Sequence, residues 1–125
     1  WGAPAPTTFA YPYGDVSYDA KQVLARRYGL LRALHKGLIE TGTDLNQAPA
    51  IGIEGMDGEA TALAWLEKAI ARKAWVILYT HDVEESPSEW GCTPGALERL
   101  ADRAVAAGCD VVTVAEGLKR ITADA

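Results

Sequence analysis

Apolar residues along the chain fall into two patterns, which are short continuous runs and stretches with helical spacing. The most prominent run spans residues 74–83 and reads Ala-Trp-Val-Ile-Leu-Tyr-Thr-His-Asp-Val. Runs of this length, rich in β-branched and aromatic residues, are typical of strands buried on both faces of a parallel sheet. We therefore predict a buried strand at 74–81. It would deliver His81 and Asp82 to the edge where α/β proteins place their sites.

The rest of the pattern predicts an alternation of strands and helices. Short apolar runs predict further strands over residues 7–12, 30–34, 48–53 and 109–114. Helical spacing and capping residues predict helices from Ser17 to Tyr28 with Gly29 after the end, from Asp57 or Gly58 to Lys73, from Thr93 to Gly108, and over 115–121. The two apolar faces of the longer helices are expected to carry Ala62, Leu63, Trp65, Leu66, Ala69 and Ile70, and Leu97, Leu100, Ala101, Ala104 and Val105.

This alternation predicts an α/β fold in which right-handed βαβ units build a parallel sheet. Residues 1–125 form one domain, and the Pro- and Gly-rich residues 1–6 are expected to be an arm or linker. Residues 35–48 and 84–92 are predicted to be loops. Because the link from 34 to 49 is too irregular for a helical crossover, the strand order there is left open. The chain begins with Trp1, so we expect it to be a piece of a longer protein.

Composition narrows the range of partners. The 125 residues carry a formal net charge of −5 and no basic cluster longer than Arg26-Arg27, so nucleic acid is not an expected partner. No apolar run has the length of a membrane span. The spacing of Cys92 and Cys109 fits no zinc or redox motif, which leaves either two small buried apolar residues or a disulfide. The compartment stays open between the cytoplasm and a bacterial cell envelope.

Candidate chemistry gathers where the predicted strands end. One sheet edge would collect Tyr13, Asp15, Glu54, Asp57, His81, Asp82 and Thr113, with His35 and Asp44 in a loop that could reach it. An acid, a histidine and aromatic walls suit a hydrolase. Each feature also has a plain structural interpretation. His81 could be a hydrogen-bonded structural residue, residues 11–14 a simple turn, and Asp44 a loop cap. Trp90, in a polar loop, could stack on a sugar or anchor the loop.

Two segments together suggest a family. They read Phe-Ala-Tyr-Pro-Tyr-Gly at 9–14 and Trp-Val-Ile-Leu-Tyr-Thr-His-Asp-Val at 75–83. With Arg-Tyr-Gly-Leu at 27–30, Ala-Pro-Ala-Ile at 48–51 and the ending from Thr93 to Glu116, they resemble the polysaccharide deacetylase (NodB-homology) family. The resemblance covers nearly the whole chain but only the C-terminal half of that family's domain.

The resemblance implies a fold, an activity and site residues. The family has a distorted (β/α) barrel and removes N-acetyl groups from N-acetylglucosamine-type glycans with a divalent, zinc-like metal. By position, His81 matches the catalytic acid, Tyr13 the aromatic residue whose backbone N–H helps hold the oxyanion, and Asp44 a supporting aspartate. Trp90, Tyr11 and Asp82 are expected to contact the sugar. Ala10 and Tyr79 stand where the family usually has arginine and leucine, and the motif at 9–14 resembles a known subset with alanine.

The resemblance also implies what lies outside the chain. The segments with the catalytic base, the metal-binding aspartate and the two metal-binding histidines would precede Trp1. His35, Cys92 and Cys109 do not replace them at a suitable spacing. We therefore expect the C-terminal half of a distorted (β/α) barrel, completed by another copy or a missing segment, with no metal bound and little or no activity alone. Two other interpretations stay open: a non-catalytic module for glycan binding or assembly, and a related hydrolase of non-peptide C–N bonds.

Overall fold

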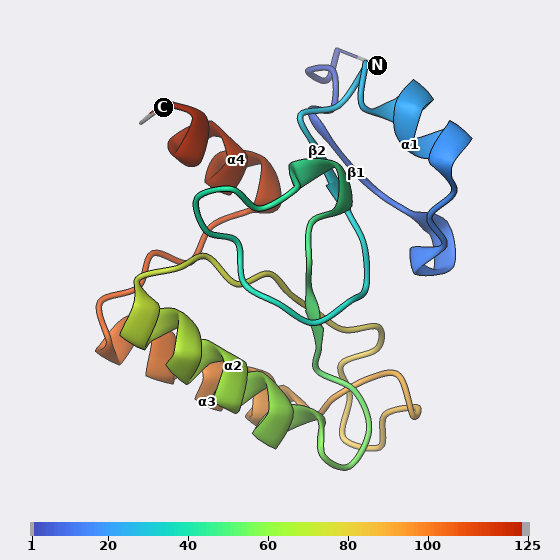
Figure 1. Cartoon of the computed structure of the whole chain (residues 1–125). Coiled ribbons are helices and arrows are strands. Elements are labelled where there is room, and N and C mark those ends of the chain that lie inside the picture. The colour runs from blue at the N-terminus through green and yellow to red at the C-terminus, as the bar shows by residue number, and fades with distance from the viewer. Residues whose placement is uncertain (1, 124–125) are drawn as a thin grey trace.

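The computed structural model describes residues 2–123 and gives a mixed α/β structure with short parallel strands (Figure 1). Its strands are β1 Thr8–Ala10, β2 Leu30–Arg32, β3 Ile51–Gly52 and β4 Leu78–Tyr79. Its helices are α1 Tyr18–Leu24, α2 Gly58–Arg72, α3 Pro94–Ala106 and α4 Val114–Ala123, with short 3₁₀ turns at Pro12–Gly14 and Leu45–Gln47. Among the described residues, no helix is long and apolar enough to cross a membrane.

The strands form two small parallel sheets, β1–β2 and β3–β4. The register places Ala10 beside Arg32, and Gly52 beside Tyr79. A parallel bridge between Arg32 and Ala48 joins the two sheets. This bridge settles the strand order that the irregular link left open, because it places the segment just before β3 beside the end of β2. Residues 2–123 therefore hold four parallel strands in chain order, without closing into a barrel.

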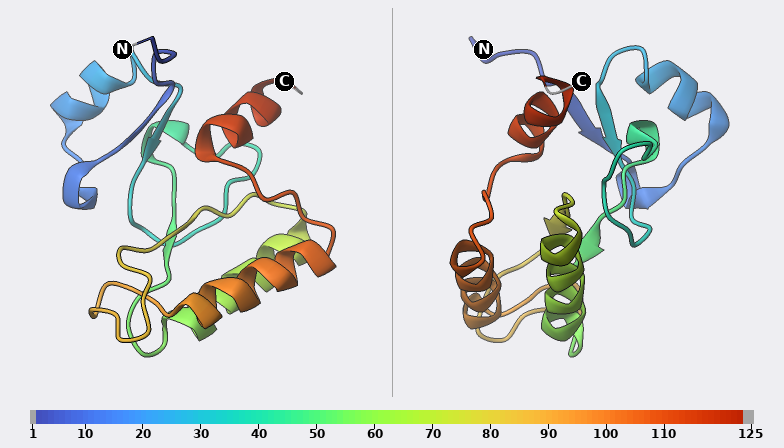
Figure 2. Two further views of the ribbon diagram at one scale, coloured as in Figure 1. Left: turned by 180° about the vertical axis from the view of Figure 1, so that it is seen from behind. Right: turned by 60° about the vertical axis from the view of Figure 1, so that its left-hand side comes forward.

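Successive side chains of a strand point to opposite faces, so the strands have an outer and an inner face. On the outer face, α1 packs near Leu31, and α2 and α3 lie side by side over Ile51, Ile53 and Leu78 (Figure 2). On the inner face, α4 packs with Leu118 against an apolar group of Leu30, Ala48, Ala50 and Ile77. Figure 2 shows β1 and β2 between α1 on one side and α4 on the other.

Most helix boundaries follow from capping groups that the sequence predicted. Ser17 accepts a hydrogen bond from the backbone N–H of Ala20, and Thr93 accepts one from Ala96, with Pro94 in the first turn of α3. The helix predicted from Asp57 is confirmed as α2, and Lys73 ends it in the left-handed conformation. Both cysteines are free, which fits two small packed side chains in the core under α2 and α3.

The strand predicted at 109–114 is wrong. In the structure residues 109–113 form no strand, Val111 is 69% exposed, and Val114 already begins α4. A strand requires a hydrogen-bonded neighbour, and no described strand pairs with this segment. The strand predicted at 74–81 is also shortened to Leu78–Tyr79, because it pairs with β3 along one edge only. Its burial on both faces is not observed, since only Ile77 of that run is fully buried.

Two helix predictions need correction as well. The first helix ends at Leu24 rather than Tyr28, and Gly29 is not in the left-handed conformation expected of a residue that follows a helix. The predicted apolar faces of α2 and α3 were too broad, since Leu63, Leu97 and Val105 are exposed. The helices meet the sheet through a narrow stripe of Ala62, Leu66, Ala96, Leu100 and Ala104. Without a strand beyond β4, the wider face has no layer to pack against.

Candidate functional site

The inner face changes from apolar to polar toward the carboxyl ends of the strands. Leu30 and Ile77 are buried under α4, and two residues further along the same strands stand Arg32 and Tyr79. By the same period of two, Glu54 follows Gly52, and His81 follows Tyr79. We call this group of Arg32, Glu54, Tyr79 and His81 the mouth.

Tyr79 is the centre of the mouth. Its hydroxyl donates a hydrogen bond to Glu54 Oε1 at 3.3 Å. The guanidinium carbon of Arg32 lies 4.9 Å from the centre of its ring, a cation–π contact, and the His81 ring meets it edge-on with 6.3 Å between ring centres. Burial, followed by the neighbouring Glu54 carboxylate, raises the pKa of Tyr79. The phenol therefore stays protonated at neutral pH and keeps Glu54 as its acceptor.

His81 is anchored through one ring nitrogen and open at the other. Its Nδ1 lies 3.1 Å from the carbonyl oxygen of Trp90 and 4.0 Å from Glu54 Oε2. A proton on Nδ1 is thus donated to the Trp90 carbonyl, which orients the ring and leaves Nε2 for other partners. The side chain is 62% exposed, so Nε2 can exchange protons with a bound molecule. This arrangement suits a general acid or base.

Glu54 stands close to the strand because residue 52 is a glycine. A Cβ at Gly52 would collide with the Glu54 carboxylate. A side chain at position 52 would therefore push Glu54 away from Tyr79 and His81. Gly52 thereby permits the contacts of the mouth.

The loop after β4 holds His81 in place, and Asp82 organises that loop. The Asp82 carboxylate accepts hydrogen bonds of 2.6 Å from both the backbone N–H and the hydroxyl of Ser88. The Asp82 carbonyl accepts one from Cys92 N–H at 2.9 Å, and a Cβ at Gly91 would collide with Asp82. The hydrogen bond from the Ser88 hydroxyl, aided by that from its N–H, lowers the pKa of Asp82. Trp90, two residues after Ser88, is 55% exposed beside His81.

Tyr11 and Tyr13 are placed very differently. Tyr11 is buried, and its hydroxyl donates to the carbonyl of Asn46 at 2.8 Å, so it joins β1 to the loop before β3. Tyr13 is fully exposed in a turn with φ of 56°, which is the left-handed region. Parallel strands put the ends of β1 and β4 at one edge. Tyr13 follows β1 and His81 follows β4, which are the first and last of the four strands. The described contacts of His81 do not include Tyr13.

Asp44 serves as a loop cap. Its carboxylate accepts a hydrogen bond from the backbone N–H of Asn46 and forms an ion pair with Lys21 of α1. The hydrogen bond from Lys21 is the main reason that the pKa of Asp44 is lowered. These contacts fasten the loop after β2 to α1. The described contacts of Asp44 are thus with Asn46 and Lys21 and not with the residues of the mouth.

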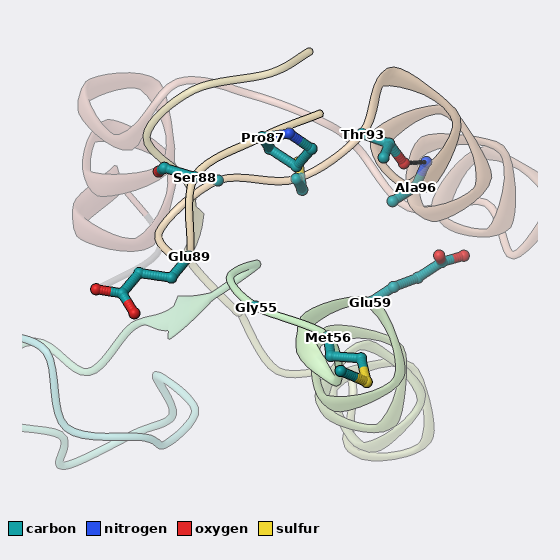
Figure 3. A pocket seen from close by; sticks show the side chains of 10 residues that line it. Gly55, Met56, Glu59, Pro87, Ser88, Glu89, Thr93 and Ala96 are labelled. Carbon is teal, nitrogen blue, oxygen red and sulfur yellow. Dashed lines mark hydrogen bonds between the residues drawn. The ribbon is translucent and has the colours of Figure 1, made fainter. Parts of the chain in front are cut away.

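Two cavities lie near these groups. A cavity of about 280 Å³ opens at the mouth, and its lining includes Leu34, Lys36, Glu54, Asp57 and Tyr79. A larger one, of about 440 Å³, lies between the starts of α2 and α3 and the loop that Asp82 organises (Figure 3). Its lining includes Met56, Glu59, Ser88, Glu89 and Thr93. Among residues 2–123, no group of three or more His, Cys, Asp or Glu side chains is arranged to hold a metal ion.

Sequence reasoning found His81, Asp82 and Trp90 but gave no role to Arg32 or Tyr79. Tyr79 could have been found from the alternation of side chains along a strand, since Tyr79 and His81 are two residues apart and so share a face. Arg32 could not be placed this way, because its meeting with Tyr79 depends on the registers that connect β2, β3 and β4. No family model, curated protein or solved structure matches this chain.

Proposed function

We propose that this chain is the C-terminal part of a polysaccharide-deacetylase-type domain, whose activity is the metal-dependent removal of N-acetyl groups from an N-acetylglucosamine-type glycan. The observation that carries the proposal is the geometry of His81. Its Nδ1 is anchored on the Trp90 carbonyl, and its Nε2 is open at the carboxyl end of a parallel strand. A general acid for a departing amine needs this combination of fixed orientation and solvent access.

In the proposed reaction, water adds to the acetyl carbonyl carbon and the C–N bond then breaks. Acetate leaves with the carbonyl carbon, and the sugar nitrogen receives its proton from His81 Nε2. Glu54 Oε2 lies 4.0 Å from His81 Nδ1, and the Trp90 carbonyl accepts the Nδ1 proton, so the proton passed to the sugar nitrogen is the one on Nε2. The residues described here offer no ligand set for the metal that the family uses. Metal ligands and the base are therefore proposed to come from outside this chain.

The strand arrangement supports the same proposal. Four parallel strands in chain order, with α1, α2 and α3 on one face, form the pattern of a sector of a (β/α) barrel. In a complete barrel each strand has two neighbours. We propose that another copy or a preceding segment supplies the strands missing here.

The test is acetate release from chito-oligosaccharides in the presence of zinc. The 125-residue chain alone should release none, whereas a longer native polypeptide with an Asp-Asp pair and a His-x-x-x-His motif upstream should be active. In that form, His81→Ala should lower kcat by roughly 10²–10⁴-fold, the usual contribution of a general acid. The matched control is His35→Ala, which should leave kcat within about twofold. Full activity of His81→Ala would overturn the proposal.

A second candidate is a non-catalytic glycan-binding module, which the exposed Trp90 at the mouth favours. In that case, chitotetraose should bind the chain as it stands, Trp90→Ala should weaken binding, and the longer form should release no acetate. A related hydrolase of cyclic amides or imides would instead act on those small substrates and not on the glycan.

A further inference from the structure

One arginine, Arg32, combines partial burial with the lack of a carboxylate partner among residues 2–123. Four arginines form ion pairs with acidic side chains, namely Arg72 with Glu40, Arg99 with Glu59, Arg103 with Glu67, and Arg120 with Asp110 and Glu116. Arg26 and Arg27 are exposed to water. Arg32 is partly buried, and among residues 2–123 no carboxylate lies within ion-pair distance of it. It is therefore a partly desolvated charge without a counter-charge.

The Arg32 side chain is also held in one orientation. Its guanidinium lies over the Tyr79 ring at 4.9 Å, and the Tyr79 hydroxyl is in turn fixed by Glu54. The polar contact that Arg32 makes is a long one, from Nη1 to the carbonyl of Ala33 at 3.5 Å. A guanidinium has five N–H donors in a planar fork that matches a carboxylate. Most of those donors remain for a ligand.

The environment of Arg32 indicates what kind of ligand would fit. Burial lowers the pKa of Arg32, so the charged form is poorly compensated and would gain from an anion. Arg32 ends β2, and Tyr79, the ring beneath its guanidinium, lines the cavity of about 280 Å³ together with Leu34 and Lys36. That volume is near the lower end of small-molecule sites. Glu54 and Asp57 in the same cavity offer acceptors for hydroxyl groups.

We infer that Arg32, stacked on Tyr79, binds a carboxylate carried by a sugar unit, so that the glycan recognised at the mouth is acidic. Arg32 binds the carboxylate of the sugar, and Glu54 and Asp57 accept hydrogen bonds from its hydroxyl groups. The sugar part of this inference rests on the proposed function, while the carboxylate part rests on Arg32 alone. The carboxylate could sit on the ring, as in a uronic acid, or on a lactyl ether.

The experiment is a set of NMR titrations of the full chain, in which Tyr79 ring signals and the Arg32 side-chain N–H are followed. The probes are glucuronic acid, N-acetylmuramic acid and neutral N-acetylglucosamine. We expect at least one acidic sugar to bind about tenfold more tightly than the neutral one, and Arg32→Gln to abolish this preference. The stronger of the two acidic probes distinguishes a ring carboxylate from a lactyl ether. Arg27→Gln, an exposed site with the same loss of charge, should keep the preference.

A further variant keeps the outcome clear. If Arg32→Gln does not fold, Arg32→Lys carries the test, because lysine lacks the planar fork and should lose most of the preference. The titrations measure binding without turnover, so a failed deacetylase proposal and a failed carboxylate site are told apart. Equal binding of acidic and neutral sugars would overturn the inference. Equal losses in Arg32→Gln and Arg27→Gln would do the same, since they would show an effect of net charge only.

Discussion

Tyr79 contacts each of the other three residues of the mouth. Its hydroxyl bonds Glu54, its face carries Arg32, and its ring meets His81 edge-on. A leucine, the residue usual at this position in the family that the sequence resembles, would provide neither the hydroxyl nor the aromatic face. The tyrosine therefore turns an apolar strand end into a polar site in which a carboxylate, a guanidinium and an imidazole all contact one side chain.

Asp82 makes the loop that supports His81 sensitive to acid. The hydrogen bonds from Ser88 lower the pKa of Asp82 in the folded protein, whereas an unfolded aspartate titrates near about 3.9. A lowered pKa stabilises the fold at pH values above that of the unfolded group, and this stabilisation is lost as the pH falls through the folded pKa. We predict that the loop loosens below about pH 4. Amide exchange at Ser88, whose N–H bonds the carboxylate, measures it.

A matched pair of variants controls this prediction. Asp82→Asn should expose the Ser88 amide to exchange over the whole pH range, whereas Asp102→Asn, at an exposed helical position, should not. Exchange at Ser88 that is the same in Asp82→Asn and in the unchanged chain would show that the carboxylate does not hold the loop.

The residue-level site was only partly accessible from sequence. His81 and Asp82 could be found because a continuous apolar run ends at them. The second role of Asp82, which is to organise the loop, depends on hydrogen bonds from Ser88, six residues further along the chain. Arg32 meets Tyr79 only through pairings between segments distant in sequence, and such pairings leave no local signal.

Helices α2 and α3 hold the outer face through a few well-buried residues. Leu100 is 3% exposed between them and the strands, whereas Leu97, one turn earlier on α3, is 40% exposed. We predict that Leu100→Ala lowers the free energy of unfolding by about 2–4 kcal/mol, through lost burial and a cavity. Leu97→Ala should cost less than about 1 kcal/mol. Urea denaturation of both variants tests this, and equal losses would mean that the face predicted from sequence is buried after all.

The elements themselves were largely predictable, and the exceptions at 109–113, in β4 and on α3 have one cause. Ser17, Thr93 and Pro94 act locally, so the starts of α1 and α3 could be predicted from sequence. Strand formation at 109–113 requires a neighbour, and the apolar composition of that segment cannot say whether one is present. The same missing neighbour explains the shortness of β4 and the exposed side of α3.

Within residues 2–123, apolar groups and the outer edges of β1 and β4 are left without a covering partner. Residues 2–123 contain no strand that pairs with the second edge of β1 or of β4, and the side chains of Val105 and Val111 are exposed. Open edges of this kind favour pairing with another chain. We predict that the isolated chain self-associates as its concentration rises, which sedimentation velocity measures.

Substitution of an exposed valine by lysine distinguishes this specific association from non-specific aggregation. Val111→Lys should reduce self-association, whereas Val23→Lys, on exposed α1, should leave it unchanged. A single monomeric species at all concentrations that also resists proteolysis would contradict the proposal that a second copy or another segment completes the fold.

The central claim is that His81 is a proton donor and not a metal ligand. Titration of the metal-free chain with zinc by calorimetry at neutral pH tests this most directly. We predict no tight, stoichiometric binding, because His81 Nδ1 is directed at the Trp90 carbonyl and its nearest carboxylate is Glu54 alone. Tight binding of one zinc ion, lost in His81→Ala, would show instead that His81 helps to form a metal site within this chain, and the acid assignment would have to be withdrawn.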